Sequence, residues 1–132
     1  MTPACTILLI DDEALIRLGT VAMLEDAGYF VFEAGNADEA LAMLAEHSDI
    51  DVVVTDVMMP RMHGHELARR IRQVHTDAKI LYVTGYSDAL FDAKLWLWED
   101  EALLEKPCTP DGVVEAVSLL VDRPGHPTTV WG

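Results

Sequence analysis

Basic residues are scarce in this chain of 132 residues. It carries nine Lys and Arg against 23 Asp and Glu, which gives a formal net charge of −14 at pH 7. Nucleic-acid binding depends on clustered basic side chains that neutralise phosphates. We therefore expect no direct nucleic-acid surface, and we look to proteins and cations as partners.

Long apolar runs and cysteines are also few. No apolar run approaches the roughly 18 to 20 residues needed to span a bilayer, and no basic region followed by an apolar segment opens the chain. We therefore expect no membrane association and a cytoplasmic location. The two cysteines, Cys5 and Cys108, are too few for a disulfide scaffold. We expect both to be inert, small apolar residues.

The size and apolar content fit one domain. A hydrophobic content of 51% is ample for a core, and 132 residues leave no room for a second domain. Internal repeats and low-complexity segments are absent. We expect the domain to cover residues 1–123 and a short, turn-rich tail to cover residues 124–132.

Apolar runs and helical spacing alternate along the chain. The run Val52 to Val54 has no period-2 alternation, which is typical of a strand buried on both faces in a parallel sheet. Strands are predicted at 6–10, 29–33, 52–54 with Asp56 at its carboxyl edge, 79–84 and 102–105. Helices are predicted at 13–27, from Asn36 or Asp38 to about 47, at 66–74, as a short or irregular segment within 87–101, and from Pro110 onward.

This alternation predicts an α/β fold. Short connections between strands and helices imply a doubly wound, five-stranded parallel sheet with helices on both faces. The strand order expected for this arrangement is 2-1-3-4-5, as in a flavodoxin-like three-layer sandwich. In the first helix, apolar residues recur at helical spacing in two sets, Leu15, Leu18 and Ala22, and Ile16 and Met23, and Gly28 follows as the cap.

Polar residues close four of the five predicted strands. Asp11 and Asp12 follow the first strand, Asp56 ends the third, Thr84 ends the fourth, and Lys106 follows the fifth. In the expected strand order these four strands are neighbours, so the five groups should share one pocket at the carboxyl edge of the sheet. Three carboxylates there would repel one another unless a cation lies between them.

The donor set favours a particular cation and reaction. Oxygen-only ligands at a shallow, wet site suit Mg²⁺, with Mn²⁺ as a substitute. A metal held by Asp12 and Asp56, with Lys106 and Thr84 opposite, forms a cage for a phosphoryl group. Asp56 can then act as the in-line nucleophile.

Two other classes fit less well. A phosphatase with an Asp nucleophile would need an Asp-x-Asp motif after the first strand, whereas Asp11 and Asp12 are adjacent. A flavin-binding fold is disfavoured because acids at 11–13 would repel a cofactor phosphate.

The same residues carry a resemblance to a known family. The matching stretches are Leu8-Leu9-Ile10-Asp11-Asp12-Glu13, Thr55-Asp56-Val57-Met58-Met59-Pro60 with Gly64, Val83-Thr84-Gly85-Tyr86, and Glu105-Lys106-Pro107. Over about residues 5 to 122 the chain resembles the receiver domain of response regulators in two-component systems. It is most similar to receivers at the ends of hybrid histidine kinases, which often serve as phosphate relays or sinks.

The resemblance implies roles for the residues at the sheet edge. Asp56 would be the phosphoacceptor, taking its phosphoryl group from a phosphohistidine on a histidine kinase or a histidine phosphotransfer protein. Asp12, Asp56 and the Met58 carbonyl would bind Mg²⁺, with Asp11 acting through water. The chain would then be a signalling protein whose only chemistry is phosphotransfer and autodephosphorylation.

Further roles follow from the same resemblance. Lys106 would contact the phosphoryl oxygen, the bond before Pro107 would be cis, and Thr84 would be the switch hydroxyl. Met58 and Tyr86, each two residues beyond a site residue, are expected to slow the attack of water on the aspartyl phosphate.

The chain also departs from the family pattern. Leu103 stands where receivers often carry Tyr or Phe, which puts the aromatic version of the switch in doubt. Cys108 replaces the usual Phe after Lys-Pro.

Partner surfaces are the least specified part of the sequence. Docking in this family points to Leu15, Leu18 and Cys108, and a homodimer would use the fourth helix, the fifth strand and the fifth helix. The large apolar residues Trp96 and Trp98 suggest a further partner surface. An alternative function is therefore a protein-binding adaptor that has the same fold and acts without phosphorylation.

Overall fold

The computed structural model describes residues 5–47, 49–56, 64–74, 78–84, 101–105 and 110–121. Strands and helices alternate along these residues. In chain order they are β1 (Thr6–Ile10), α1 (Ala14–Asp26), β2 (Phe30–Ala34), α2 (Ala37–Glu46), β3 (Val52–Asp56), α3 (Gly64–Val74), β4 (Lys79–Thr84), β5 (Glu101–Glu105) and α5 (Pro110–Val121).

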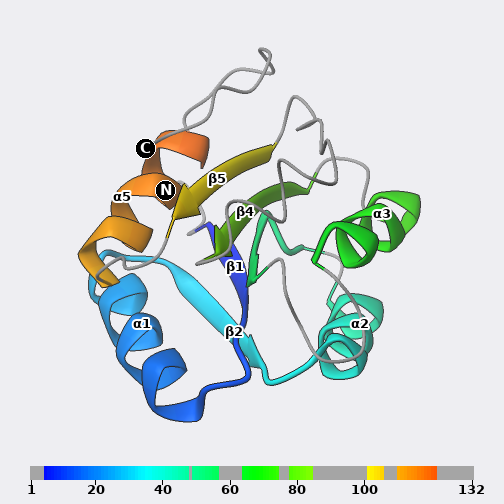
Figure 1. Cartoon of the computed structure of the whole chain (residues 1–132), viewed down its shortest axis with the longest axis horizontal. Coiled ribbons are helices and arrows are strands. Elements are labelled where there is room, and N and C mark those ends of the chain that lie inside the picture. The colour runs from blue at the N-terminus through cyan, green and yellow to red at the C-terminus, as the bar shows by residue number, and fades with distance from the viewer. Residues whose placement is uncertain are drawn as a thin grey trace.

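The strands form one sheet in the order β2-β1-β3-β4-β5, and every pairing is parallel. Helices α1 and α5 lie on one face of this sheet, and α2 and α3 lie on the other (Figure 1). The prediction of a parallel sheet covered by helices on both faces is confirmed.

Two apolar cores hold these layers together. Alternate residues of the central strands point to opposite faces, so that Leu8, Val53 and Ile80 pack on the side of α2 and α3. Their neighbours Ile7 and Val54 pack with buried residues of α1 and α5 on the other side. This double burial explains why β1, β3 and β4 each contain a continuous apolar run in the sequence.

The bounds of the elements follow the predictions with small shifts. β1 and β4 match their predicted ranges, while β2 begins and ends one residue later than predicted. Tyr29 lies outside β2 because its N–H donates to the Leu24 carbonyl at 3.1 Å, which continues the end of α1. α3 begins two residues earlier than predicted, at Gly64, and β5 begins at Glu101.

Helix α1 differs from its prediction in two respects. It begins at Ala14 with Glu13 as its N-cap, whereas the prediction began the helix at Glu13. Its buried residues are Thr20, Val21 and Leu24, whereas Leu15 and Leu18 are 85% and 62% exposed. The Thr20 hydroxyl donates to the Ile16 carbonyl at 3.1 Å, which lets a polar side chain face the core.

The helix caps follow the predictions. Gly28 has a φ of 100°, a left-handed conformation that glycine adopts without strain after α1. The Asn36 side chain accepts a hydrogen bond from the Glu39 N–H at 2.8 Å and caps α2.

Within the part of the chain that the structure describes, no helix is both long and apolar enough to cross a membrane.

Lys79 fastens the end of α5 to the sheet. Its Nζ atom donates to the carbonyls of Leu120 and Val121, each at 3.0 Å. Because a cation at a helix C-terminus also interacts favourably with the helix dipole, we expect Lys79→Met to lower the free energy of unfolding by about 1 to 2 kcal/mol. Urea denaturation measures this change. The exposed Arg70, changed to Met, is the control and should shift stability far less; equal effects would contradict the capping role.

Candidate functional site

The turn between β1 and α1 carries three consecutive acids. The Asp11 N–H donates to the Ala34 carbonyl of β2 at 3.1 Å, and the Asp11 Oδ1 atom accepts from the Glu13 N–H at 2.9 Å. Asp11 is half-buried, while Asp12 and Glu13 are exposed. The backbone at Asp11 is thus fixed against β2 on one side and against the start of α1 on the other.

The side chains of this turn form an acidic group. Asp11, Asp12 and Glu13 each offer a carboxylate oxygen, and these oxygens all lie within 4.8 Å of one another. An exposed set of oxygen ligands is the chemistry that Mg²⁺ prefers, since this ion keeps several waters. The residues present therefore fit a hydrated divalent cation. Glu13 belongs to this group and was not expected as a ligand from the sequence.

Asp56 ends the neighbouring strand. It is the last residue of β3, is half-buried and pairs with Val83 of β4. Ile10 pairs with Thr55, so continuing the register places Asp11 beside Asp56 at the same edge of the sheet. Asp56 is not one of the three acids that lie within 4.8 Å of one another. The buried Thr55 donates its hydroxyl to the Asp56 carbonyl at 3.1 Å, a contact that the sequence did not reveal.

Only some of the other predicted site residues lie in the described part of the chain. Thr84 is the last residue of β4 and pairs with Glu105, the last residue of β5. Leu103 pairs with Tyr82 within the β4–β5 ladder. The predictions for Met58, Tyr86, Trp96, Trp98, Lys106, Pro107 and Cys108 concern residues outside the described part of the chain.

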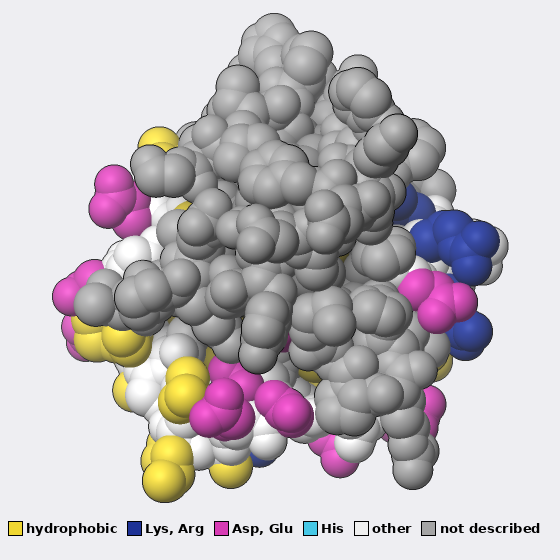
Figure 2. All heavy atoms as spheres, in the orientation of Figure 1, with side chains coloured by type: hydrophobic (Ala, Val, Ile, Leu, Met, Phe, Trp, Pro, Cys, Tyr) yellow, Lys and Arg dark blue, Asp and Glu magenta, His cyan; other side chains and the backbone are white. Residues whose placement is uncertain are grey.

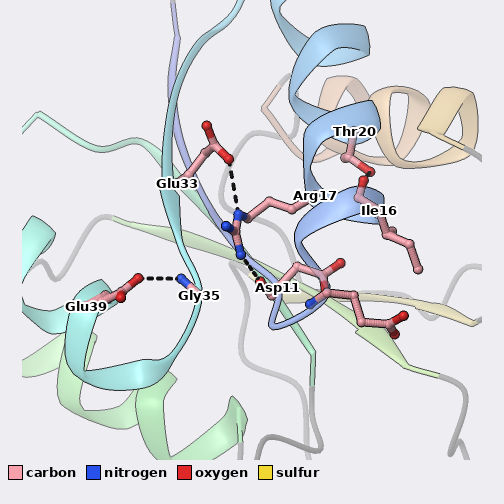
Figure 3. Close-up of polar contacts among 8 residues, drawn as sticks. Asp11, Ile16, Arg17, Thr20, Glu33, Gly35 and Glu39 are labelled. Carbon is pink, nitrogen blue, oxygen red and sulfur yellow. Dashed lines mark hydrogen bonds and ion pairs between the residues drawn. The ribbon is translucent and has the colours of Figure 1, made fainter.

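Arg17 is a site neighbour that the sequence analysis missed. Its guanidinium donates to the Asp11 carbonyl at 2.5 Å and to the Glu33 carboxylate of β2 at 3.1 Å (Figure 3). Little in the sequence indicated these contacts. Arg17 lies one helical turn after Glu13, but its contact with Glu33 depends on the pairing of β1 with β2, in which Leu9 pairs with Glu33.

Charged and apolar side chains are distributed unevenly over the surface. Lys and Arg side chains gather over α3, where Arg69 and Arg70 are exposed (Figure 2). Hydrophobic side chains lie over α1, to which the exposed Leu15, Ile16 and Leu18 belong. An exposed apolar strip of this kind is typical of a protein-binding surface.

Cys5 lies at the opposite end of the sheet, just before β1, and is half-buried. Burial, together with the smaller effect of the neighbouring Asp51 carboxylate, raises the pKa of its thiol to about 11, although Lys79 acts in the opposite direction. The thiol is therefore neutral near pH 7, in keeping with the expectation of an inert residue.

The reactivity of Cys5 tests this environment. In a Cys108→Ser background, we expect alkylation at pH 8 to be about 100-fold slower than for an unperturbed cysteine, because only the thiolate reacts. The raised pKa means that the folded state favours the protonated thiol, so its contribution to stability is lost as pH rises from about 9 through about 11. Asp51→Asn should speed alkylation. Equal rates in the folded protein and in urea would contradict the prediction.

Comparisons with known proteins agree with this geometry. Residues 7–118 match the family model described as the response regulator receiver domain. The sensor kinase CckA of Brucella abortus is 34% identical over 124 residues, which are 93% of this chain and 13% of that protein. The response regulator receiver protein CpdR of the same organism is 36% identical over 101 residues, covering 76% of this chain and 83% of that protein.

A solved structure gives the same result. The crystal structure of the receiver domain from the hybrid histidine kinase CckA superposes with a TM-score of 0.74 at 27% identity, and the match covers 89% of this chain and 99% of that domain. This chain spans only a small part of the Brucella kinase and most of CpdR. The flavodoxin-like arrangement of a parallel sheet and helices is shared with solved receiver domains, including that of CckA. The chain belongs to the family of response regulator receiver domains of two-component systems.

Proposed function

We propose that this receiver accepts a phosphoryl group onto Asp56 from a phosphohistidine of a histidine kinase or a histidine phosphotransfer protein. The reaction depends on Mg²⁺, and the phosphorylated domain signals by protein contact or by passing the phosphoryl group on. The observation that carries the proposal is the acidic group at the carboxyl end of β1, next to the strand that Asp56 ends. The strand order supports it, because β1, β3, β4 and β5 end side by side.

The proposed metal ligands come from two neighbouring strands. Asp12, Asp56 and the Met58 carbonyl would hold the ion, and Asp11 would act through water. A bound Mg²⁺, or Mn²⁺ in its place, neutralises negative charge on the phosphoryl oxygens. A ligand set drawn from both strands is supported by the parallel pairing of β1 with β3, because Asp11 and Asp12 directly follow β1 and Asp56 ends β3.

The proposed reaction is an in-line transfer. A carboxylate oxygen of Asp56 forms a bond to phosphorus while the bond between phosphorus and the donor histidine nitrogen breaks. Lys106 would contact a phosphoryl oxygen. The Thr84 hydroxyl would donate a hydrogen bond to the phosphoryl group and so act as the switch that responds to phosphorylation. The cis bond at Pro107 would place Lys106. Water then hydrolyses the aspartyl phosphate, and Met58 and Tyr86 would set that rate.

The extent of the domain is part of the proposal. We take the receiver as residues 1–123, which contain the matched residues 7–118, and residues 124–132 as a tail. A homodimer through the fourth helix, β5 and α5 stays a prediction, as do partner contacts of Trp96, Trp98 and Cys108.

Intact mass spectrometry tests the function directly. We expect the protein to gain the mass of one phosphoryl group when it is incubated with acetyl phosphate and Mg²⁺, and to gain none when EDTA is present. A phosphorylated histidine phosphotransfer protein serves as the second donor. No gain from either donor would contradict the phosphotransfer function and favour the adaptor alternative.

The exposed residues of α1 favour a docking role in either case. Because Leu15 and Leu18 are largely exposed, replacing both with Asn should leave the melting temperature and the reaction with acetyl phosphate nearly unchanged. The double variant should accept the phosphoryl group more slowly from the phosphorylated phosphotransfer protein. Intact mass spectra of samples quenched at successive times measure this rate. Equal rates from the protein donor would exclude this strip from docking.

A further inference from the structure

Arg17 joins the acidic turn to the second strand. Its Nη1 atom donates to the backbone carbonyl of Asp11, and its Nε atom donates to a carboxylate oxygen of Glu33. Figure 3 shows the guanidinium reaching from α1 between these two partners. One side chain therefore connects three elements, β2, α1 and the turn that carries the acidic group.

The guanidinium is held closely in this position. The Arg17 side chain is 21% exposed, compared with 44% for Glu33. A Cβ atom added at Gly35 would lie 3.3 Å from Nη1, so the backbone after β2 packs against the guanidinium. The flat, forked guanidinium suits two acceptors in fixed directions better than an ammonium group does.

Asp11 has three separate restraints, two on its backbone and one on its side chain. Its N–H donates to Ala34, its carboxylate accepts from Glu13, and its carbonyl accepts from Arg17. The first two restraints act on the N–H and on the side chain of Asp11 and leave some freedom of rotation to the peptide plane after it, and that peptide leads directly to Asp12. The bond from Arg17 removes this freedom, and so it bears on where both Asp carboxylates point.

From this geometry we propose that Arg17 is a positioning residue of the Mg²⁺ site. It fixes the Asp11 carbonyl and thereby orients the carboxylates of Asp11 and Asp12, and Glu33 holds the guanidinium in place. The inference rests on the proposed function in taking this acidic group as the metal site. Outer residues that orient metal ligands typically change metal affinity by about 10- to 100-fold when they are mutated.

Positioning and simple charge make opposite predictions. Arg17 is a cation bound to the backbone of the turn that carries the three carboxylates, so on charge alone its removal should strengthen the binding of Mg²⁺. If Arg17 acts by positioning, its removal should weaken binding. The sign of the change in the dissociation constant therefore separates the two effects.

The experiment measures Mg²⁺ binding by isothermal titration calorimetry on the full chain. We expect Arg17→Met to bind Mg²⁺ about tenfold more weakly than the wild type. Arg17→Lys keeps the charge but has no fork to serve both acceptors, and it should bind several-fold more weakly. Arg69→Met is the matched control, because Arg69 makes a similar pair with Glu66 far from the turn in sequence; its affinity should equal that of the wild type.

Hydrogen exchange gives a readout that needs no metal. In Arg17→Met, the Glu13 amide, which donates to the Asp11 carboxylate, should exchange faster while the amides of β3 keep their protection. Unchanged or tighter Mg²⁺ binding in Arg17→Met, or Arg17→Lys binding like the wild type, would overturn the positioning role and leave the proposed function intact. A wild type that binds no Mg²⁺ would overturn both.

Discussion

Asp56→Asn is expected to gain no phosphoryl group under conditions in which the wild type is fully phosphorylated by acetyl phosphate and Mg²⁺. The amide has nearly the shape of the carboxylate but lacks a nucleophilic, negatively charged oxygen. Because Asp56 ends β3 and is half-buried, the isosteric change should leave the strand and its pairing with β4 in place. The expected effect is a complete loss of the reaction without a loss of the fold.

The other end of β3 offers a matched control. Asp51 lies directly before β3, and its side chain accepts a hydrogen bond from the Thr6 N–H at 2.8 Å. Asp51→Asn removes the same charge and keeps an acceptor there, so this variant should be phosphorylated like the wild type. Melting temperatures of the three proteins exclude unfolding as the cause of any loss. A phosphorylated Asp56→Asn would place the acceptor elsewhere in the chain.

The sheet could be predicted well because its central strands are buried on both faces. Burial from both sides requires an unbroken apolar run, and Ile7 to Ile10 and Val52 to Val54 are such runs. The edge strand β2 is mostly exposed or half-buried, so its pattern gave its place only to within one residue. The pairing of β1 with both β2 and β3 follows from chain alternation and packing rather than from any single residue.

The buried face of α1 could not be predicted from spacing alone. The helix carries more apolar residues than one face needs, and two spaced sets compete for the core. The face that packs against α5 and the sheet contains Thr20, whose hydroxyl finds its partner within the helix. Leu15 and Leu18 remain outside, which polarity alone would not suggest.

The candidate site was predictable to the extent that it depends on strand ends. Asp11, Asp12, Asp56 and Thr84 lie at the carboxyl edge because parallel strands end together. Arg17 was not predictable, because its contacts depend on the turn of α1 that faces β2 and on the backbone carbonyl of Asp11. Every residue has a backbone carbonyl, so residue types do not show which carbonyl accepts a hydrogen bond.

The acidic turn predicts a second large effect, on stability. Without metal, the carboxylates of Asp11, Asp12 and Glu13 repel one another, since their oxygens lie within 4.8 Å. Water screens these exposed charges, so the repulsion is modest. We expect Asp12→Ala to raise the melting temperature in EDTA by about 2 °C, given how small changes in free energy shift the midpoint of domains of this size.

The response to Mg²⁺ should change much more than the metal-free stability. Ligand binding to the folded state alone stabilises the wild type by about 2.7 kcal/mol at 100 times the dissociation constant. We expect Asp12→Ala to lose nearly all of this gain, because it lacks one of the proposed metal ligands in the acidic group. Differential scanning calorimetry with EDTA and with Mg²⁺ measures both quantities, with Asp49→Ala, an exposed acid outside the group, as the control. A variant that melts below the wild type in EDTA would contradict the repulsion, and one that keeps the Mg²⁺ gain would remove Asp12 from the metal site. Asp12→Ala is thus expected to be more stable than the wild type without metal and to gain less stability from Mg²⁺. A general loss of packing would lower stability in both conditions and cannot produce this combination.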